Sequence, residues 1–350
     1  MDENLQDALQ SYLSGALPDR QGLQIRDLTR LNAGWESDVY AFTAEHGPAG
    51  ARQGEGLILR IYPGNDAYDK SAREFQCMHQ LAQLGYPVPR VHLLERERSP
   101  FGQPFVVMEK VEGQVLWPLL SRSSGEQQQR LLTLFCQLFV QLHSLPWQSF
   151  DSAQGRPFAG DDARYDTGDP YAVVAGTLDK WRPYVTGFPL PGFLPVWEWL
   201  EAQAPRVACP RPAPVHWDFH PGNVLVRADG SAVVIDWTGF DVSDPRFDLA
   251  WTLLLIAAYE GPHWRAPILR EYERLAGGGV ERLEFFDVAA CFRRLFSIAV
   301  SLSAGAESLG MRPGAEHKMK QAEPIRRIYD LLLERTGLRV PEVESLLQEC

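Results

Sequence analysis

Four polar side chains that can bind a metal or move a proton occur close together in the second half of the chain. His216, Asp218 and Asn223 lie in the segment VHWDFHPGNVLV, and Asp236 follows in the segment VVIDW. A carboxylate can accept a proton from a hydroxyl group. Carboxylate and amide oxygens are also the ligands that Mg²⁺ prefers. The stretch therefore indicates metal binding combined with proton transfer.

A predicted hairpin explains how Asn223 and Asp236 are brought together. Asp229-Gly230 is a strong signal for a two-residue turn, because apolar residues flank it on both sides. Counting outwards from that turn pairs Asn223 with Asp236. Directly opposed residues have Cβ atoms ~5 Å apart, a spacing at which two oxygen groups can share one Mg²⁺. Asp218 lies five residues before Asn223, in a loop that the intervening Pro-Gly pair helps to turn.

A purely structural explanation of these residues is the alternative. A buried hairpin with polar ends can contain an Asn and an Asp by chance, since short motifs match by accident. Here His, Asp, Pro, Asn and a second Asp occur in order beside two apolar strands. Structural needs seldom place so many polar groups at the border of apolar strands, so we interpret the segment as a functional site.

The first third of the chain has the pattern of strands with one main helix. We expect strands over residues 37–42, 57–61 and 104–111 and a helix over residues 69–84, preceded by a short amphipathic helix over residues 4–17. The polar, Gly-rich residues 46–56 are predicted to form a loop. This part of the chain therefore predicts a small β-rich lobe.

After Gly113 the pattern becomes mainly helical. An apolar stripe runs from Leu131 to Leu145, and further helices are expected at about 171–182 and 195–203 and from the hairpin to the C-terminus. Residues 151–170 are rich in Asp and Gly and are predicted to form a loop or insertion. The change in pattern places a boundary between two lobes near residues 111–113.

Composition excludes several classes of protein. The 350 residues carry a net charge of −11, which argues against a nucleic-acid partner because such binding depends on clustered Lys and Arg. The N-terminus is polar, and no apolar run approaches the ~20 residues that span a membrane. The five cysteines are scattered without a CxxC pair, so neither disulfides nor a zinc site is indicated. We expect a cytoplasmic protein with no membrane contact and no obligate protein partner.

The pattern HxDxxxxN, followed by an Asp at the end of the next strand, resembles the catalytic core of the aminoglycoside phosphotransferase family. The resemblance covers about residues 20–335 and implies a bilobal α+β fold like that of protein kinases. It implies an antiparallel sheet with one main helix in the N-terminal lobe and a mostly helical C-terminal lobe. Residues 1–110 would form the nucleotide-binding lobe, and residues 111–350 the catalytic lobe, with a hinge near 108–113.

The resemblance also implies a role for each residue of the core. Asp218 would be the catalytic base, and His216 and His220 would support the catalytic loop. Asn223 and Asp236 would hold Mg²⁺ across the phosphates of ATP. The family usually has Gly where this chain has Trp217. Asp244 and Asp248 match a DPxxDLA element, where helix capping accounts for both and a role in orienting the catalytic loop is the alternative.

Further nucleotide-binding residues follow from the same resemblance. The loop NAGWESD, with Gly34 and Ser37, would cover the phosphates. Arg60, where family members often have Lys, would bind phosphate oxygens, and Glu74 would orient it. Adenine would contact backbone groups from Glu109 to Val111, and Met108 would line its pocket. For Arg60 and Glu74, exposed surface charges are the alternative.

We therefore predict an ATP- and Mg²⁺-dependent kinase that phosphorylates a hydroxyl of a small molecule, with an aminoglycoside-like or other amine-bearing acceptor. Acids expected to face an amine are Asp161, Asp162, Asp166, Asp169, Asp241, Glu260 and Glu307. Macrolide, choline-like, amino-alcohol and sugar acceptors are alternatives. A nucleotide-binding protein without kinase activity is less favoured because Asp218, Asn223 and Asp236 are all present. A protein kinase is disfavoured because Asp-Trp-Thr replaces DFG and no APE follows.

Overall fold

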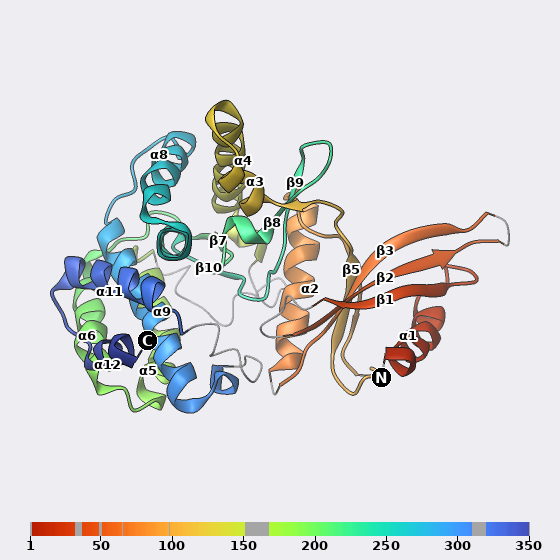
Figure 1. Cartoon of the computed structure of the whole chain (residues 1–350), viewed down its shortest axis with the longest axis horizontal. Helices are drawn as coiled ribbons and strands as arrows, with labels where there is room; N and C mark the ends of the chain where they lie inside the picture. Colours follow the sequence, from red (N-terminus) through yellow and green to blue (C-terminus); the bar gives the residue numbers. More distant parts are fainter. Residues whose placement is uncertain are drawn as a thin grey trace. The chain divides into compact units, whose positions relative to one another are not determined.

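The protein is described by a computed structural model that covers residues 2–31, 37–48, 51–64, 66–97, 99–150, 168–309 and 320–349. The chain forms two compact units. The first contains Met1–Gln114 and Leu225–Thr238, and the second contains Val115–Val224 and Gly239–Cys350. Figure 1 shows the elements coloured along the sequence.

The first unit is built on a five-stranded antiparallel sheet in the order β1-β2-β3-β5-β4 (Figure 1). Its strands are β1 (Gln24–Leu31), β2 (Asp38–His46), β3 (Gln53–Ile61), β4 (Val91–Glu95) and β5 (Phe105–Glu109), and its helices are α1 (Asp2–Ala16) and α2 (Ala67–Gln83). Leu9 and Leu13 of α1 are fully buried in one apolar cluster with Phe42, Leu57 and Phe105 of the sheet. The predicted β-rich first part of the chain is confirmed: β2, β3 and β5 lie at the three expected positions, and β1 and β4 complete the sheet.

The loop predicted over residues 46–56 is shorter than expected. β2 and β3 stay paired from Asp38 opposite Ile61 to His46 opposite Gln53. The end of this hairpin is polar and exposed, and backbone hydrogen bonds extend it without apolar side chains. Hydrophobic periodicity therefore underestimated the length of β3.

The hairpin formed by β8 (Val224–Val226) and β9 (Ala232–Val234) returns the chain to the first unit. Trp237, just after β9, is fully buried and contacts Tyr86 edge to face, with ring centroids 5.6 Å apart. The backbone N–H of Val234 donates to Pro87 O at 2.9 Å. These contacts make the hairpin part of the first unit's structure, although more than a hundred residues separate it from β5 in sequence.

The turn of this hairpin differs from the two-residue turn that Asp229-Gly230 predicted. Gly230 N donates to Arg227 O at 3.0 Å, and Arg227 N donates to Ser231 O at 2.8 Å. Gly230 has a φ of +85°, so the loop is a three-residue turn that ends in a left-handed glycine. Pairing is therefore shifted by one residue from the predicted register, and the cross-strand argument that opposed Asn223 to Asp236 is wrong.

The second unit is mostly helical, as predicted. Its helices are α3 (Leu116–Arg122), α4 (Gly125–Ser144), α5 (Ala172–Gly187), α6 (Leu194–Gln203), α7 (Pro245–Leu255), α8 (Arg265–Ala276), α9 (Leu283–Ala304), α11 (Ala322–Thr336) and α12 (Pro341–Glu349). Two short strands, β7 (Ala213–Val215) and β10 (Asp241–Ser243), pair antiparallel. The predicted loop at 151–170 falls mainly on residues outside the described part of the chain.

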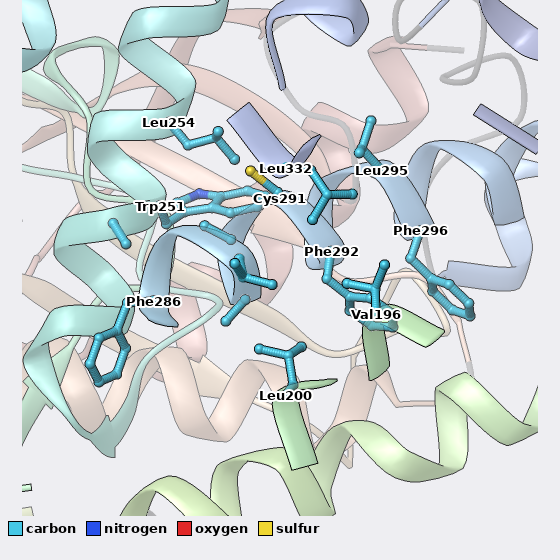
Figure 2. Close-up of a cluster of buried hydrophobic side chains, with 14 of the residues drawn as sticks. Val196, Leu200, Trp251, Leu254, Phe286, Cys291, Phe292, Leu295, Phe296 and Leu332 are labelled. Carbon is cyan, nitrogen blue, oxygen red and sulfur yellow. The ribbon is translucent and has the colours of Figure 1, made fainter. Parts of the chain in front are cut away.

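Helix α9 forms the centre of the second unit's core. Its buried face, with Phe286, Cys291, Phe292, Leu295 and Phe296, meets side chains from three other helices (Figure 2). These partners are Val196 and Leu200 of α6, Trp251 and Leu254 of α7, and Leu332 of α11. Dense packing of this kind holds side chains in fixed rotamers. The core therefore fixes α7, whose first turns carry residues of the candidate site.

The cysteines and the helix lengths were both the subject of predictions from the sequence, and the described residues bear on each of them. Cys77, Cys136, Cys209 and Cys291 are buried free thiols, and burial raises the pKa of the thiol in each of them. Within the described ranges, every helix is too short or too polar to cross a membrane.

Candidate active site

Arg60 is the centre of a charged cluster in the first unit. Its Nη1 donates to Glu74 Oε1 at 2.8 Å, its Nη2 to Asp236 Oδ1 at 2.9 Å, and its Nε to Ser37 Oγ at 2.8 Å. β3 supplies Arg60 and α2 supplies Glu74, so the predicted pair of strand cation and helix acid is present. The alternative that both are exposed surface charges is wrong, since Arg60 is largely buried and Glu74 is 1% exposed.

Burial and the attraction between opposite charges have opposing effects on the pKa values in this cluster. Burial raises the pKa of the Glu74 carboxyl, and the Arg60 guanidinium opposes that effect. Burial by itself lowers the pKa of Arg60, but Glu74 and Asp236 outweigh it and the net change is upward. Tyr62 donates its hydroxyl to the second carboxylate oxygen of Glu74, and burial raises the pKa of Tyr62 well above its usual range. Arg60 is thus a fixed cation whose fork geometry suits phosphate oxygens.

The other residues predicted to contact the nucleotide are in the loop before β2 and in β5. Gly34 falls outside the described residues, whereas Ser37 is buried and accepts from Arg60. Met108 is a buried residue of β5, paired with Ile58. Each of these nucleotide contacts remains a prediction.

Hydrogen bonds of the backbone after β5 limit which N–H groups are open to adenine. Glu109 N donates to Arg90 O at 2.8 Å and Lys110 N donates to Gly56 O at 3.0 Å. The N–H of Val111 donates to no oxygen of the described residues. An adenine ring nitrogen can accept a hydrogen bond from a backbone N–H that has no partner in the sheet. Val111 is therefore the donor that this segment can offer.

The side chain of Glu109 has a partner of its own. Arg227 Nη2 donates to Glu109 Oε1 at 2.5 Å, and Arg90 N donates to Glu109 Oε2 at 3.1 Å. The carboxylate therefore braces the hairpin of β8 and β9 within the first unit.

The catalytic loop of the second unit follows β7 and is shaped by an unusual residue. Trp217 has a φ of +65°, the left-handed region that Gly adopts readily and that bulky residues avoid. Its ring packs against Trp181 and Phe247, with centroids 5.9 Å and 5.6 Å away. This conformation explains why a glycine is usual here, and the aromatic packing offsets its cost in this chain.

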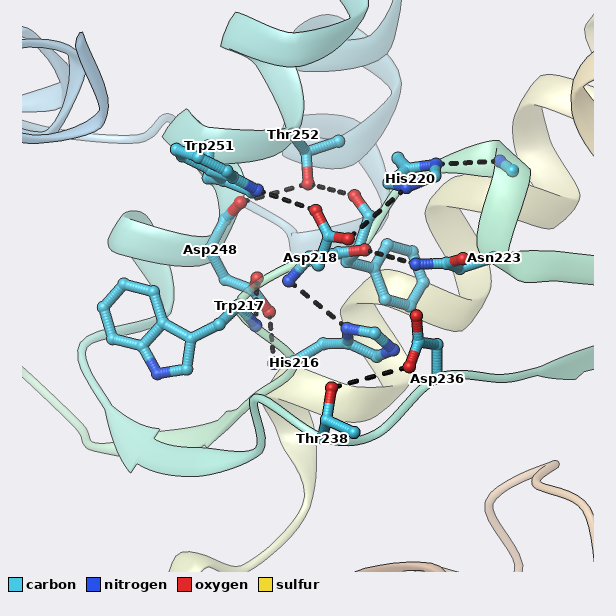
Figure 3. A network of polar contacts seen from close by, with 12 residues as sticks. His216, Trp217, Asp218, His220, Asn223, Asp236, Thr238, Asp248, Trp251 and Thr252 are labelled. Atoms are coloured by element: carbon cyan, nitrogen blue, oxygen red, sulfur yellow. Dashed lines mark hydrogen bonds and ion pairs between the residues drawn. The ribbon is translucent and has the colours of Figure 1, made fainter. Parts of the chain in front are cut away.

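Asp248 holds this loop through both oxygens of its carboxylate. Oδ2 accepts from His216 N at 2.7 Å and Oδ1 accepts from Trp217 N at 2.9 Å (Figure 3). His143 approaches Oδ2 with Nε2 at 3.5 Å, and its Nδ1 contacts the Tyr272 hydroxyl at 2.8 Å. Asp248 is fully buried in the first turn of α7. It therefore orients the catalytic loop, and helix capping alone does not account for it.

Asp244 has the capping role that the sequence suggested. Its Oδ1 accepts from Arg246 N at 3.0 Å at the start of α7. The Arg246 guanidinium also binds both of its oxygens. The carboxylate of Asp244 therefore fixes the beginning of the helix that carries Asp248.

The carboxylate of Asp218 is held on one oxygen and open on the other. Oδ1 accepts from the indole Nε1 of Trp251 at 3.0 Å, and Oδ2 lies 3.6 Å from His220 Nε2, beyond hydrogen-bond distance (Figure 3). The side chain is 46% exposed. Burial raises the pKa of Asp218, but the facing His220 and the Trp251 indole outweigh it and hold the pKa well below its usual range. The group is therefore an ionised carboxylate with one accessible oxygen.

The two predicted support histidines bind backbone groups of the same loop. His220 Nδ1 accepts from Gly222 N at 3.0 Å, so Nε2 carries the proton and points toward Asp218. His216 Nδ1 accepts from Asp218 N at 3.3 Å. Both therefore shape the loop around Asp218, and their role in supporting catalysis stays a prediction.

The two predicted metal ligands are described each in its own unit. Asn223 donates from Nδ2 to Asp218 O at 3.0 Å, which leaves its carbonyl oxygen to face a cation. Asp236 has a φ of +68°, accepts from Arg60 and is 42% exposed. Thr238 Oγ1 also lies 3.5 Å from its Oδ1. An amide oxygen and a carboxylate oxygen are each of a kind that Mg²⁺ accepts as a ligand, and their joint binding of one ion stays a prediction.

No group of three or more His, Cys, Asp or Glu residues that could hold a metal occurs among the described residues. A metal held chiefly by protein side chains is therefore not indicated in that part of the chain.

The acids proposed to face an amine are dispersed. Asp161, Asp162 and Asp166 fall outside the described residues. Asp241 pairs with Lys180 at 2.6 Å, and Asp169 accepts from Tyr171 N at 2.9 Å. Glu260 and Glu307 are exposed. The described acids thus form no common amine-binding group.

Trp251 was missed from the sequence because nothing in its type or spacing marks it. It lies on α7, three residues after Asp248, and only the fold brings its indole to Asp218. The DPxxDLA element did mark the start of this helix, so position on α7 was the one available signal.

The chain is similar to known proteins over most of its length. The sequence model of the phosphotransferase enzyme family, APH, matches residues 27–286. Acyl-CoA dehydrogenase family member 10 of Mus musculus is 28% identical over 273 residues, which make up 76% of this chain and 23% of that protein. The chain therefore spans about a quarter of the length of the curated relatives it matches.

Solved structures show the same fold. The GDP and kanamycin complex of APH(2")-IIia has a TM-score of 0.58 at 15% identity, covering 93% of this chain and 97% of that one. Plasmodium vivax ethanolamine kinase has a TM-score of 0.58 at 11% identity, covering 98% and 89%. These likenesses confirm the predicted α+β, kinase-like fold. The family model spans well over half of the sequence, and this chain belongs to the phosphotransferase enzyme family.

Proposed function

We propose that the protein transfers the γ-phosphoryl group of ATP to a hydroxyl of a small molecule, with Mg²⁺ as cofactor. The observation that carries the proposal is the state of Asp218. Its carboxylate is ionised, fixed on Oδ1 by Trp251, and set in a loop that Asp248 holds by two backbone hydrogen bonds. A fixed carboxylate with one accessible oxygen is what a group that orients a hydroxyl requires.

The proposed reaction assigns one task to each residue. The acceptor oxygen attacks the γ-phosphorus, the bond to the β–γ bridging oxygen breaks and ADP leaves, and the proton of the acceptor passes to Asp218 Oδ2. Arg60 binds phosphate oxygens, and Glu74 holds Arg60 in place. Asn223 and Asp236 would hold Mg²⁺, which would supply positive charge against the phosphates. Positioning and charge neutralisation account for most of the rate gain.

The nucleotide is proposed to bind the first unit through its adenine and phosphates. Adenine accepts a hydrogen bond from Val111 N–H, because the N–H groups of Glu109 and Lys110 are used within the sheet. Met108 lines the base pocket and the loop with Gly34 and Ser37 covers the phosphates. APH(2")-IIia was solved with GDP, so GTP belongs beside ATP in any test.

The acceptor is proposed to be an amine-bearing alcohol, as the net charge of −11 favours a cationic partner. Kanamycin in one relative's structure and the name ethanolamine kinase in another agree with this class. The dispersed acids of the described part do not select one member of it.

A panel assay tests the function. The full chain is incubated with Mg²⁺ and either ATP or GTP in the presence of kanamycin, ethanolamine, choline, a macrolide or a sugar, and phosphorylated products are measured by mass spectrometry. A product 80 Da heavier (roughly the mass of a transferred phosphoryl group, as phosphoryl transfer requires) supports the proposal. Tight nucleotide binding without transfer to any member, or to water, supports a nucleotide-binding protein without kinase activity.

A further inference from the structure

The indole of Trp251 makes a direct hydrogen bond to the catalytic carboxylate. Its Nε1 lies 3.0 Å from Asp218 Oδ1, and the side chain is 7% exposed (Figure 3). A carboxylate turns easily about its terminal torsion, which has a broad profile. One fixed donor on one oxygen therefore selects the orientation of the whole group.

Arg293 of α9 fixes the Trp251 ring in turn. Its guanidinium carbon lies 3.9 Å from the ring centroid, and its Nη1 donates to Trp217 O at 2.9 Å. Stacking of this kind is favourable when partly desolvated. The same arginine thus joins α9, the Trp251 ring and the loop that carries Asp218.

An indole N–H differs from the other groups that face Asp218. His220 faces Oδ2 with an imidazole, and His216 accepts from the Asp218 backbone N–H. The indole is a donor only and carries no charge. It can therefore hold Oδ1 without adding a positive charge, which would weaken Asp218 as a base.

We propose that Trp251 is a positioning residue for phosphotransfer. Its indole N–H holds Oδ1 of Asp218 so that Oδ2 is the oxygen that receives the proton of the acceptor. The proposal rests on the proposed function, because it takes Asp218 as the base. It goes beyond that function in naming a residue outside the HxDxxxxN pattern and in assigning different tasks to the two carboxylate oxygens.

The test compares Trp251→Phe with Trp197→Phe. Trp197 of α6 is likewise a buried tryptophan, 4% exposed, with its ring 5.6 Å from that of Phe292, and it makes no hydrogen bond to Asp218 among the described contacts. The probe is hydrolysis of MgATP with water as acceptor, together with transfer to ethanolamine. W251F should lower kcat on the order of tenfold, the range for loss of one hydrogen bond to a charged group. W197F should stay within about twofold of wild type.

The split between kcat and KM separates positioning from a loss of packing. W251F should lower kcat with an unchanged KM for MgATP, because the lost hydrogen bond acts on Asp218 and not on the nucleotide. W197F should leave both constants within about twofold of wild type. A W251F enzyme that keeps the wild-type kcat overturns the proposal, as does an equal effect of both variants.

A spectroscopic measurement keeps the test independent of turnover and of the folding of W251F. The chain has ten tryptophans, and Asp218→Asn should shift one indole N–H proton signal upfield, because a neutral amide is a weaker acceptor than a carboxylate. The absence of this shift would show that the hydrogen bond between Trp251 and Asp218 does not exist. If this shift occurs while wild type transfers no phosphate, the proposed function fails and the contact stands.

Discussion

At the scale of single residues, Glu74 is the clearest case of a buried charge that a partner of opposite charge holds. Glu74 is 1% exposed and binds Arg60 and Tyr62. Removing one partner of a buried pair leaves an uncompensated charge. Glu74→Ala should therefore lower the free energy of unfolding by about 3 kcal/mol and weaken MgATP binding, as measured by urea denaturation and calorimetry.

The exposed pair Glu126–Arg130 supplies the control for that change. Its side chains are 92% and 76% exposed, so Glu126→Ala should change the free energy of unfolding by less than about 0.5 kcal/mol. Equal losses from E74A and E126A would contradict a buried, functional Arg60 cluster.

Asp248 supports a second prediction at this scale. An asparagine keeps one acceptor oxygen but turns an N–H₂ group toward the other backbone donor. Asp248→Asn should therefore cost about 2 kcal/mol of unfolding free energy and reduce kcat more than MgATP affinity. The exposed Asp229, which accepts from Ser231 N at 2.9 Å, gives the control Asp229→Asn, expected within about 0.5 kcal/mol of wild type. A larger loss in MgATP affinity than in kcat would argue against a loop-orienting role.

At the scale of elements, apolar periodicity predicted where strands and helices lie, but not their register. The strand with Arg60 and the helix with Glu74 followed from their patterns, whereas the ion pair between the two residues was expected only from the family resemblance. The hairpin of β8 and β9 could not be placed in register, because Asp-Gly suits both a two-residue turn and the end of a three-residue turn. Trp217 has a left-handed backbone that no local propensity favours, and tertiary packing decides it.

The hairpin turn gives a prediction about one glycine. Gly230 has a φ of +85°, and a Cβ added there would meet no atom within 4 Å. The cost of Gly230→Ala is therefore conformational alone, about 1 kcal/mol, measured by thermal unfolding. Gly15, in helix α1 with equally open surroundings, should instead gain about 0.5 kcal/mol on the same substitution. The same sign for both variants would contradict the turn described here.

At the scale of the whole molecule, the first unit is assembled from two separate stretches of chain. Residues 225–238 bring in Asp236 beside Arg60 and bury Trp237 against Tyr86. The pattern of the first 110 residues could not reveal this, because the contacts join residues far apart in sequence. It follows that the first unit is not one continuous segment of the sequence.

A fragment experiment checks this division. Residues 1–114 alone lack the Trp237 contact, and losing a buried Trp costs about 3–5 kcal/mol, a large share of the ~5–15 kcal/mol that stabilises a domain. The fragment should unfold without a cooperative transition, and adding residues 225–238 through a flexible linker should restore one. Cooperative unfolding of residues 1–114 at the same midpoint as the longer fragment would contradict the assembly.

The central claim is that Asp218 carries phosphotransfer, and Asp218→Asn tests it most directly. Asparagine keeps the size of the side chain, but its neutral amide cannot take up the proton of the substrate hydroxyl as a carboxylate does. The measurement is the single-turnover rate of γ-phosphoryl transfer at saturating MgATP, with the MgATP dissociation constant determined on the same protein. We expect a loss of about 10²-fold or more in rate with nucleotide affinity within about twofold. A D218N protein that transfers phosphate at the wild-type rate would show that another group performs the reaction.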